Sequence, residues 1–252
     1  MEPTPGEEPR RTPTRKSPQR ASASLKVLAA GSLRAPFDAL TAEWRRASAS
    51  TVEVSYDNAR ALARRIEAGE PTDVFASASP VEPATLHAAG LVDEPRPFAA
   101  NRLVVAVPAG SEATDARILA RPGVRVVIEV EGIPLGDYTR ILLDRLDECY
   151  EPGFGRAVLT NVVSQEQTVT AVVERLTRGE ADAAVLYDTD VAAASDRLRA
   201  IRVPVAVRGI YVIATVRDGP APRAAAAWLA LLAGPRGRSV LRAAGFDDPP
   251  GA

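Results

Sequence analysis

Short apolar runs alternate with segments of helical periodicity from Leu25 to the end of the chain. The apolar runs, rich in Val, Leu and Ala, are typical of buried strands. They predict strands at 25–30, 52–56, 74–76, 103–107, 125–130, 183–187, 203–207 and 210–216. The segments between them repeat apolar residues at helical spacing and predict helices at 33–47, 59–68, 83–88, 138–146, 168–178, 221–232 and 238–244. The alternation predicts an α/β fold with helices on both faces of the sheet.

The junction between the first strand and the first helix carries the first sign of a binding site. Ser32 follows the strand directly, and the apolar residues after it have helical spacing, so Ser32 stands where an N-cap belongs. A helix N-terminus presents unpaired N–H groups and a positive partial charge, which favour an anion. By itself the junction favours the simpler interpretation, in which Ser32 only caps its helix, because Ser is a common cap.

Three further turns share this design, because each follows a strand or loop and opens a helix with mostly small or polar residues. They are Asp57-Asn58-Ala59, Pro134-Leu135-Gly136-Asp137 and Gln167-Thr168. Ligands of open α/β sheets bind beyond the carboxyl ends of the strands, where such turns gather. If the four turns converge, their N–H groups surround one point and suit a tetrahedral oxyanion held by neutral donors.

Composition narrows the class of protein. Hydrophobic residues make up 46% of the 252 residues, enough for a substantial core, and a net charge of −1 argues against a nucleic-acid partner. No apolar run reaches the roughly 18 residues of a membrane span. The lone Cys149 excludes an internal disulfide and is expected to be a buried or half-buried thiol. With a single histidine, His87, and no phosphate-binding loop or metal-ligand cluster, the sequence predicts neither an enzyme nor a cofactor.

The N-terminal segment differs from the rest of the chain. Residues 1–24 are rich in Pro, Ser, Thr, Glu and Arg and have no hydrophobic periodicity, so they are predicted to be a disordered polar leader. No apolar segment follows their basic residues, as a secretory signal requires, and no Cys is placed to take a lipid anchor. We therefore expect neither a signal peptide nor a lipid anchor in this sequence.

Ordered segments between residues 25 and 246 resemble those of a known family. They are Leu28-Ala29-Ala30-Gly31-Ser32-Leu33, the run from Leu62 to Ala78, Asn101-Arg102-Leu103-Val104, Pro134-Leu135-Gly136-Asp137-Tyr138, the run from Gly179 to Asp190, Gly234-Pro235-Arg236-Gly237 and Gly245-Phe246. In this order they resemble the molybdate-binding proteins of ABC transporters, which belong to the type 2 superfamily of periplasmic binding proteins. Each segment alone is weak, but the ordered set covers nearly all of the chain after the leader.

The resemblance implies a two-lobed fold in which each lobe is a central mixed sheet flanked by helices. The expected lobes are 25–104 with 206–252, and 105–205, joined by a two-strand hinge near 102–107 and 203–207. The implied function is capture of molybdate or tungstate between the lobes and delivery to an ABC permease, by a monomer in the periplasm or cell envelope. Because the sequence shows no export signal, a cytoplasmic location stays open.

The resemblance also implies which residues bind the oxyanion. Ser32 would bond it through its hydroxyl and N–H, and Ala59 stands at the second turn. Leu135 and Val169 would act through their backbone N–H groups, and Tyr187 through its phenol. The metal atom would be held only as the oxyanion, by the same residues, so no side chain is expected to ligate it.

One turn departs from the family pattern. The family usually has Ser before the second helix, whereas this chain has Asn58-Ala59 and lacks that hydroxyl. The Asn58 amide and the Ala59 N–H are expected to donate in its place. Loss of one charge-assisted hydrogen bond costs about 1.5–3 kcal/mol, roughly tenfold to a hundredfold in affinity. Two alternatives stay open: a binder of another tetrahedral oxyanion such as sulfate, and a cytosolic oxyanion sensor or carrier that acts on a protein partner.

Overall fold

The computed structural model describes residues 24–47 and 50–249. The predicted leader at 1–24 lies outside the described residues, apart from Ser24. The strands in the described part are β1 (Leu25–Ala30), β2 (Val52–Asp57), β3 (Val74–Ser77), β4 (Arg96–Pro108), β5 (Val126–Glu129), β6 (Val162–Glu166), β7 (Ala183–Tyr187), β8 (Leu198–Ile201) and β9 (Arg208–Thr215). The helices are α1 (Arg34–Ala47), α2 (Ala59–Glu67), α3 (Val81–Ala88), α4 (Pro134–Cys149), α5 (Phe154–Thr160), α6 (Val169–Thr177), α7 (Asp188–Ala193), α8 (Pro222–Ala233) and α9 (Pro235–Ala243), with 3-10 turns η1 (Gly31–Leu33) and η2 (Ala116–Ala120).

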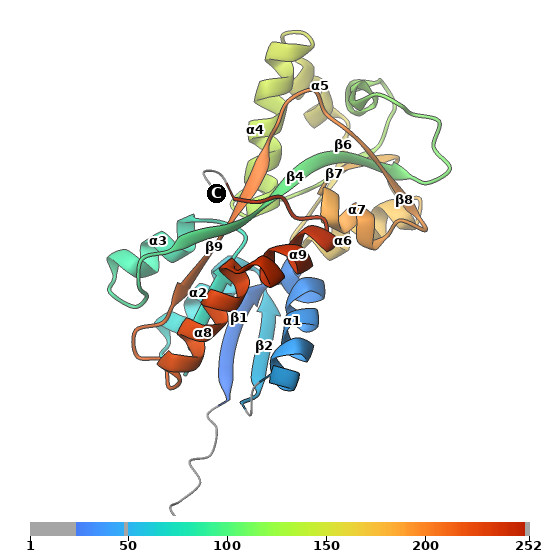
Figure 1. Ribbon diagram of the computed structural model, residues 1–252. Helices are drawn as coiled ribbons and strands as arrows, with labels where there is room; N and C mark the ends of the chain where they lie inside the picture. The colour runs from blue at the N-terminus through green and yellow to red at the C-terminus, as the bar shows by residue number, and fades with distance from the viewer. Residues whose placement is uncertain (1–23, 48–49, 250–252) are drawn as a thin grey trace, which may run out of the picture.

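The strands form one mixed sheet in the order β2-β1-β3-β9-β4-β7-β5-β6, and β8 pairs with β4 outside this path. Strand β1 is parallel to β2 and β3, and β5 is parallel to β6 and β7, whereas β4 and β9 pair antiparallel with their neighbours. Strand β4 belongs to both halves of the sheet, because its residues 96–102 pair with β9 and its residues 103–108 pair with β7 and β8. Its green ribbon accordingly runs from one half of the molecule into the other (Figure 1).

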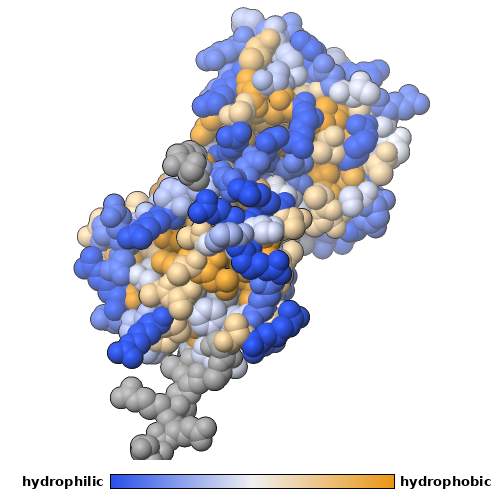
Figure 2. All heavy atoms as spheres, viewed as in Figure 1, coloured by the Kyte–Doolittle hydropathy of each residue, from blue (hydrophilic) through white to orange (hydrophobic). Residues whose placement is uncertain are grey.

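Separate hydrophobic cores lie on the two sides of this crossing. One large core contains only residues between Leu103 and Val207. A second core joins β1 and β3 to α1 and α8, where the buried Trp228 ring contacts the rings of Phe37 and Trp44, and a smaller cluster packs α2 and α3 on the same half. Figure 2 shows two bodies, with hydrophilic side chains over much of the visible face of each. The partition into lobe 1 (25–104 with 206–252) and lobe 2 (105–205) stays a prediction, and the first core extends beyond its limits to Leu103, Val104 and Val207.

The chain crosses between the lobes in β4 and again in the segment that leads into β9. The Leu103 N–H donates to the Val207 carbonyl at 3.0 Å, which joins the two crossings. The strand predicted at 203–207 is wrong, because residues 202–207 are irregular and the strand lies earlier, at β8. Pro204 lacks the N–H that a sheet ladder needs, so this apolar run forms no ladder and joins β4 only through the Val207 carbonyl. The hinge therefore consists of β4 and the start of β9 with its approach.

Some further elements differ from the sequence predictions. The apolar pattern does not predict β6, α5 or α7. Strand β6 is an edge strand of half-exposed and exposed residues, and α5 and α7 have only 7 and 6 residues, too few for a clear period. The expected burial of Cys149 is also wrong, because this residue ends α4 and is exposed. In contrast, all residues of the predicted strand β7 are buried, as a continuous apolar run indicates for a strand covered on both faces.

Candidate functional site

A cavity of about 470 Å³ lies between the lobes, where the parallel strands end. Lobe 1 lines it with the turns that follow β1 and β2, and lobe 2 lines it with the turns that follow β5, β6 and β7. We call it the interlobe pocket. All six residues singled out from the sequence border it: Ser32, Asn58, Ala59, Leu135, Val169 and Tyr187. The structure thus brings together the four helix-opening turns that the sequence analysis identifies.

The predicted capping role of Ser32 is wrong in its detail. Gly31, Ser32 and Leu33 form the turn η1 ahead of α1, and the N-cap of this turn is Ala30, which makes no side-chain cap. The Ser32 hydroxyl instead shares a hydrogen bond of 2.8 Å with the Tyr211 hydroxyl of β9, 179 residues away in the chain. Burial raises the pKa of the Tyr211 phenol well above its usual range, so it stays a neutral partner. Ser32 is therefore positioned from the hinge.

The second turn caps its own helix. The Asn58 Oδ1 atom accepts the Ala61 N–H at 2.8 Å, and the Asn58 N–H and Nδ2 donate to Asp57 Oδ1 at 2.7 and 3.3 Å. The Asn58 amide, expected to serve the ligand, is thus engaged within the turn, and its Nδ2 atom retains one N–H for a ligand. Ala59 is 2% exposed and is the first residue of α2, so helix geometry leaves its N–H without an intrahelical acceptor.

The N-terminus of α4 contains a residue that the sequence analysis misses. The N–H groups of Leu135 and Gly136 donate to Glu129 Oε2 at 3.1 and 3.3 Å. Gly136 is required here, because a Cβ atom at this position would lie 1.8 Å from the Val130 carbonyl oxygen. Glu129 ends β5 and is 2% exposed, so a carboxylate at the end of an apolar strand was the available signal.

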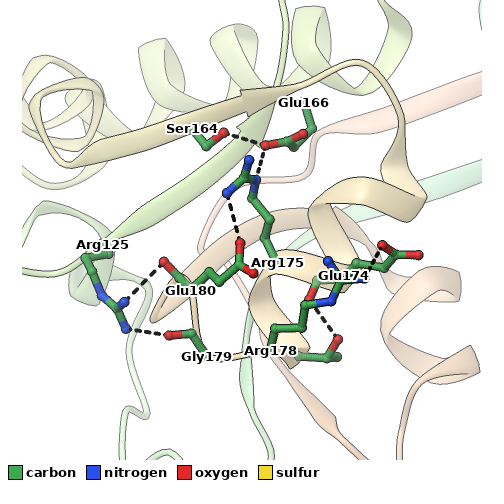
Figure 3. A network of polar contacts seen from close by, with 9 residues as sticks. Arg125, Ser164, Glu166, Glu174, Arg175, Arg178, Gly179 and Glu180 are labelled. Atoms are coloured by element: carbon green, nitrogen blue, oxygen red, sulfur yellow. Dashed lines mark hydrogen bonds and ion pairs between the residues drawn. The ribbon is translucent and has the colours of Figure 1, made fainter.

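A polar network fixes the turn before α6. Thr168 caps this helix by accepting the Ala171 N–H at 3.2 Å, and Val169 is the first helical residue. Figure 3 shows Arg175 of α6 joined to Glu166 at the end of β6 and to Glu180 beyond the helix, the latter at 2.9 Å. Glu166 also accepts from Ser164, and this bond and Arg175 lower its pKa. The network joins α6 to the end of β6. It thereby helps to hold the Thr168–Val169 turn at the pocket wall.

Two buried polar atoms of lobe 2 lack partners. The Tyr187 side chain is 2% exposed, and its hydroxyl has no hydrogen-bond partner among the described residues. Asp190 of α7 is half-buried, and its Oδ2 atom is shielded and has no partner in the same part of the chain. Burial raises the pKa of Asp190 to about 7 and that of Glu129 to about 7, and it raises the pKa of Tyr187 well above the usual range. Near pH 7 the Tyr187 phenol is therefore neutral, and the carboxyl groups of Glu129 and Asp190 are partly protonated.

Two guanidinium groups also border the pocket, one from each lobe. Arg34 follows η1 and stacks over the Tyr56 ring, with its Cζ atom 4.2 Å from the ring centre. Arg197 lies beyond α7 and pairs with the exposed Asp196 at 3.6 Å. The turns by themselves suggest a wall of neutral donors. The wall also contains these two cations. Nothing in the spacing of Arg197 marks it as a pocket residue, because α7 was not predicted.

Within residues 24–47 and 50–249, no group of three or more His, Cys, Asp or Glu side chains is placed to hold a metal ion. None of the helices in this part of the chain combines the length and apolar character of a membrane span. The single histidine has a local contact instead, since His87 Nδ1 lies 3.1 Å from the Val92 carbonyl oxygen.

Known proteins resemble this chain along nearly its whole length. It is 29% identical over 238 residues to the molybdate-binding protein ModA of Mycobacterium tuberculosis strain H37Rv, covering 92% of this chain and 87% of that relative. Among solved structures, the periplasmic molybdate-binding protein of Azotobacter vinelandii superposes with a TM-score of 0.73 at 19% identity, over 89% of this chain and 99% of the other. The sulfate-binding protein SubI of M. tuberculosis gives 0.76 at 18% identity, over 89% and 86%. At these identities the two structures show the shared fold.

A family model described as bacterial extracellular solute-binding protein matches residues 25–247. The match spans both lobes and every turn of the interlobe pocket. It agrees with the prediction of a binding protein in place of an enzyme, and with a ligand in place of a cofactor. The chain therefore belongs to the family of bacterial extracellular solute-binding proteins.

Proposed function

We propose that the protein is the solute receptor of an ABC transporter and binds molybdate or tungstate in the interlobe pocket. The observation that carries the proposal is the convergence of four helix-opening turns, two from each lobe, on one cavity. A relative named as a molybdate-binding protein, similar over 92% of the chain, supports this choice of ligand. The residues proposed to contact the oxyanion are Ser32, Asn58, Ala59, Leu135, Val169 and Tyr187.

The chemistry of the wall suits an oxyanion. The Tyr187 hydroxyl is buried without an acceptor, and an oxyanion oxygen would supply one. The Ser32 hydroxyl shares one hydrogen bond with Tyr211 and retains further capacity for a ligand. The N-termini of α2 and α6 add N–H groups and positive partial charge at Ala59 and Val169.

Because the pocket lies between the lobes, movement of the lobes toward each other can enclose the ligand. A cavity of about 470 Å³ exceeds the volume of one tetrahedral oxyanion, so all donors reach the ligand only if the lobes approach. Arg60 of lobe 1 already donates to the Gly132 carbonyl of lobe 2 at 2.8 Å, beside the pocket. A ligand that bonds both lobes favours the closed arrangement, and closure about the β4–β9 hinge follows.

Delivery to a permease, action as a monomer and a place in the periplasm or cell envelope belong to the same proposal. The description of the matched family as extracellular supports the location. A permease can distinguish the loaded receptor from the empty one by binding a surface to which both lobes contribute. Ligand-driven closure forms such a surface. The alternative of a cytosolic sensor or carrier uses the same pocket with a different partner.

Calorimetric titration with molybdate, tungstate, sulfate and phosphate tests the proposal. We expect one molybdate or tungstate ion per chain and at least about tenfold weaker binding of sulfate, because the smaller ion cannot span the donors of both lobes. Tight sulfate binding with weak molybdate binding would favour the sulfate alternative. Silence toward all four ions would contradict an oxyanion receptor.

A further inference from the structure

The N-terminus of α4 already holds a carboxyl group. Pro134 has no N–H, and the next two N–H groups, of Leu135 and Gly136, lie 3.1 and 3.3 Å from Glu129 Oε2. Glu129 is 2% exposed and borders the interlobe pocket. An oxyanion that uses the Leu135 N–H must therefore share this donor with Glu129 or displace it.

A second carboxyl group, that of Asp190, borders the same pocket and has one oxygen atom without a partner in the described part of the chain, although a backbone hydrogen bond with Tyr187 reaches the group. Asp190 Oδ2 is shielded from solvent and has no hydrogen-bond partner among the described residues. The hydroxyl of Tyr187, a side chain that is 2% exposed, lacks one too. Buried polar atoms without partners are costly, so a polar ligand that contacts Tyr187 and Asp190 is favoured at this point.

Burial controls the charge of both carboxyl groups. It raises the pKa of each to about 7, and for Glu129 the repulsion from Asp190 adds to the rise. The other charged or titratable groups around them are Arg34, Asp57, Asp137, Tyr138, Arg140, Tyr187, Arg197 and Tyr211. Arg140 donates to the Glu129 backbone carbonyl, and within the described residues no ion pair joins Arg34 or Arg197 to either carboxylate. Neither carboxylate is therefore compensated by a cation.

A bound dianion shifts this balance further. Its negative charge beside the two carboxyl groups favours their protonated forms, because like charges repel. A protonated carboxyl group gains an O–H donor, which an oxyanion oxygen can accept. When both groups are ionised, they repel the dianion, and Glu129 retains the donors of Leu135 and Gly136.

We propose that Glu129 and Asp190 bind the ligand of the interlobe pocket as protonated groups, so that the pocket takes up a tetrahedral oxyanion dianion together with protons on these two carboxyl groups. The inference rests on the proposed function, because it presupposes an oxyanion in the pocket. The protons come from solvent onto the two carboxylates, and no bond of the oxyanion changes. Since the free groups titrate near pH 7, affinity falls as the pH rises through this value.

The test is calorimetric titration of the full chain with molybdate at about pH 6.5 and about pH 8.5, where the ion stays a monomeric dianion, in two buffers of different protonation enthalpy. For the unmodified protein we expect affinity at least about tenfold lower at the higher pH, with uptake of about one proton or more per ion.

Glu129→Gln and Asp190→Asn keep the shape of each side chain and remove its titration. Each should bind more tightly at high pH, flatten the profile and reduce the proton uptake. Glu148→Gln, at an exposed position of α4, is the matched control and should behave as the unmodified protein.

Each outcome separates the inference from the proposed function. Molybdate binding with equal affinity at both pH values and no proton uptake would overturn the inference and leave the oxyanion receptor intact. A full pH dependence retained in both variants would also overturn it, because other groups would then carry the protons. No binding of molybdate, tungstate or sulfate at either pH would overturn the proposed function itself.

Discussion

Replacing Gly136 with alanine is expected to lower the free energy of unfolding by about 3 kcal/mol and to weaken molybdate binding at least about tenfold. The added Cβ atom would lie 1.8 Å from the Val130 carbonyl oxygen and 2.6 Å from its carbon. Both are backbone atoms, so α4 has to move away from the end of β5. That movement displaces the Leu135 N–H and breaks its contact with Glu129. Urea unfolding followed by circular dichroism, together with calorimetric titration, measures the two effects.

Gly110→Ala is the matched control for this variant. A Cβ atom at Gly110 meets nothing within 4 Å, and this turn lies outside the pocket lining, so stability and binding should change little. A Gly136→Ala protein as stable as the control would contradict the close approach of α4 and β5 on which the pocket geometry depends.

Loss of two hydroxyl groups, one from each lobe, is expected to weaken oxyanion binding without loss of the fold. Ser32→Ala and Tyr187→Phe should each raise the dissociation constant for molybdate about tenfold to a hundredfold, since each removes one bond to a charged ligand. Tyr187→Phe should leave the apo protein at least as stable, because its hydroxyl is buried without a partner. Ser32→Ala should cost some stability through its lost bond to Tyr211. Titration and thermal unfolding separate these outcomes.

Ser239→Ala in α9 and Tyr150→Phe at the end of α4 are the corresponding controls away from the pocket. Both should bind molybdate as the unmodified protein does. If Ser32→Ala and Tyr187→Phe also bind with unchanged affinity, the assignment of donors is wrong, whatever the ligand.

The sequence is sufficient to predict the α/β class and the four turns, because these depend on local periodicity and on residues adjacent in the chain. It is insufficient for the details that depend on distant partners. Ser32 is a clear example, since its local pattern indicates a helix cap and its actual partner, Tyr211, lies on the hinge strand. The strand predicted at 203–207 fails because an apolar run with Pro204 cannot complete a ladder.

The charge of the pocket is the part that sequence reasoning misses most. Glu129 is adjacent to the turn that opens α4, yet only the folded geometry shows that it occupies the Leu135 N–H. Arg34 and Arg197 come from different lobes and both border the pocket only in the folded chain. A cage of neutral donors follows from helix termini alone, whereas the presence of two guanidinium groups and two buried carboxyl groups in the pocket wall needs the tertiary structure.

The most direct test is a crystal structure of the protein grown with tungstate, with data collected at the tungsten absorption edge. We expect one strong anomalous peak per chain in the interlobe pocket, with the oxyanion oxygens in hydrogen-bond contact with Ser32, Ala59 and Tyr187. A tungsten peak elsewhere on the molecule, with no peak between the lobes, would contradict the assignment of this pocket as the oxyanion site.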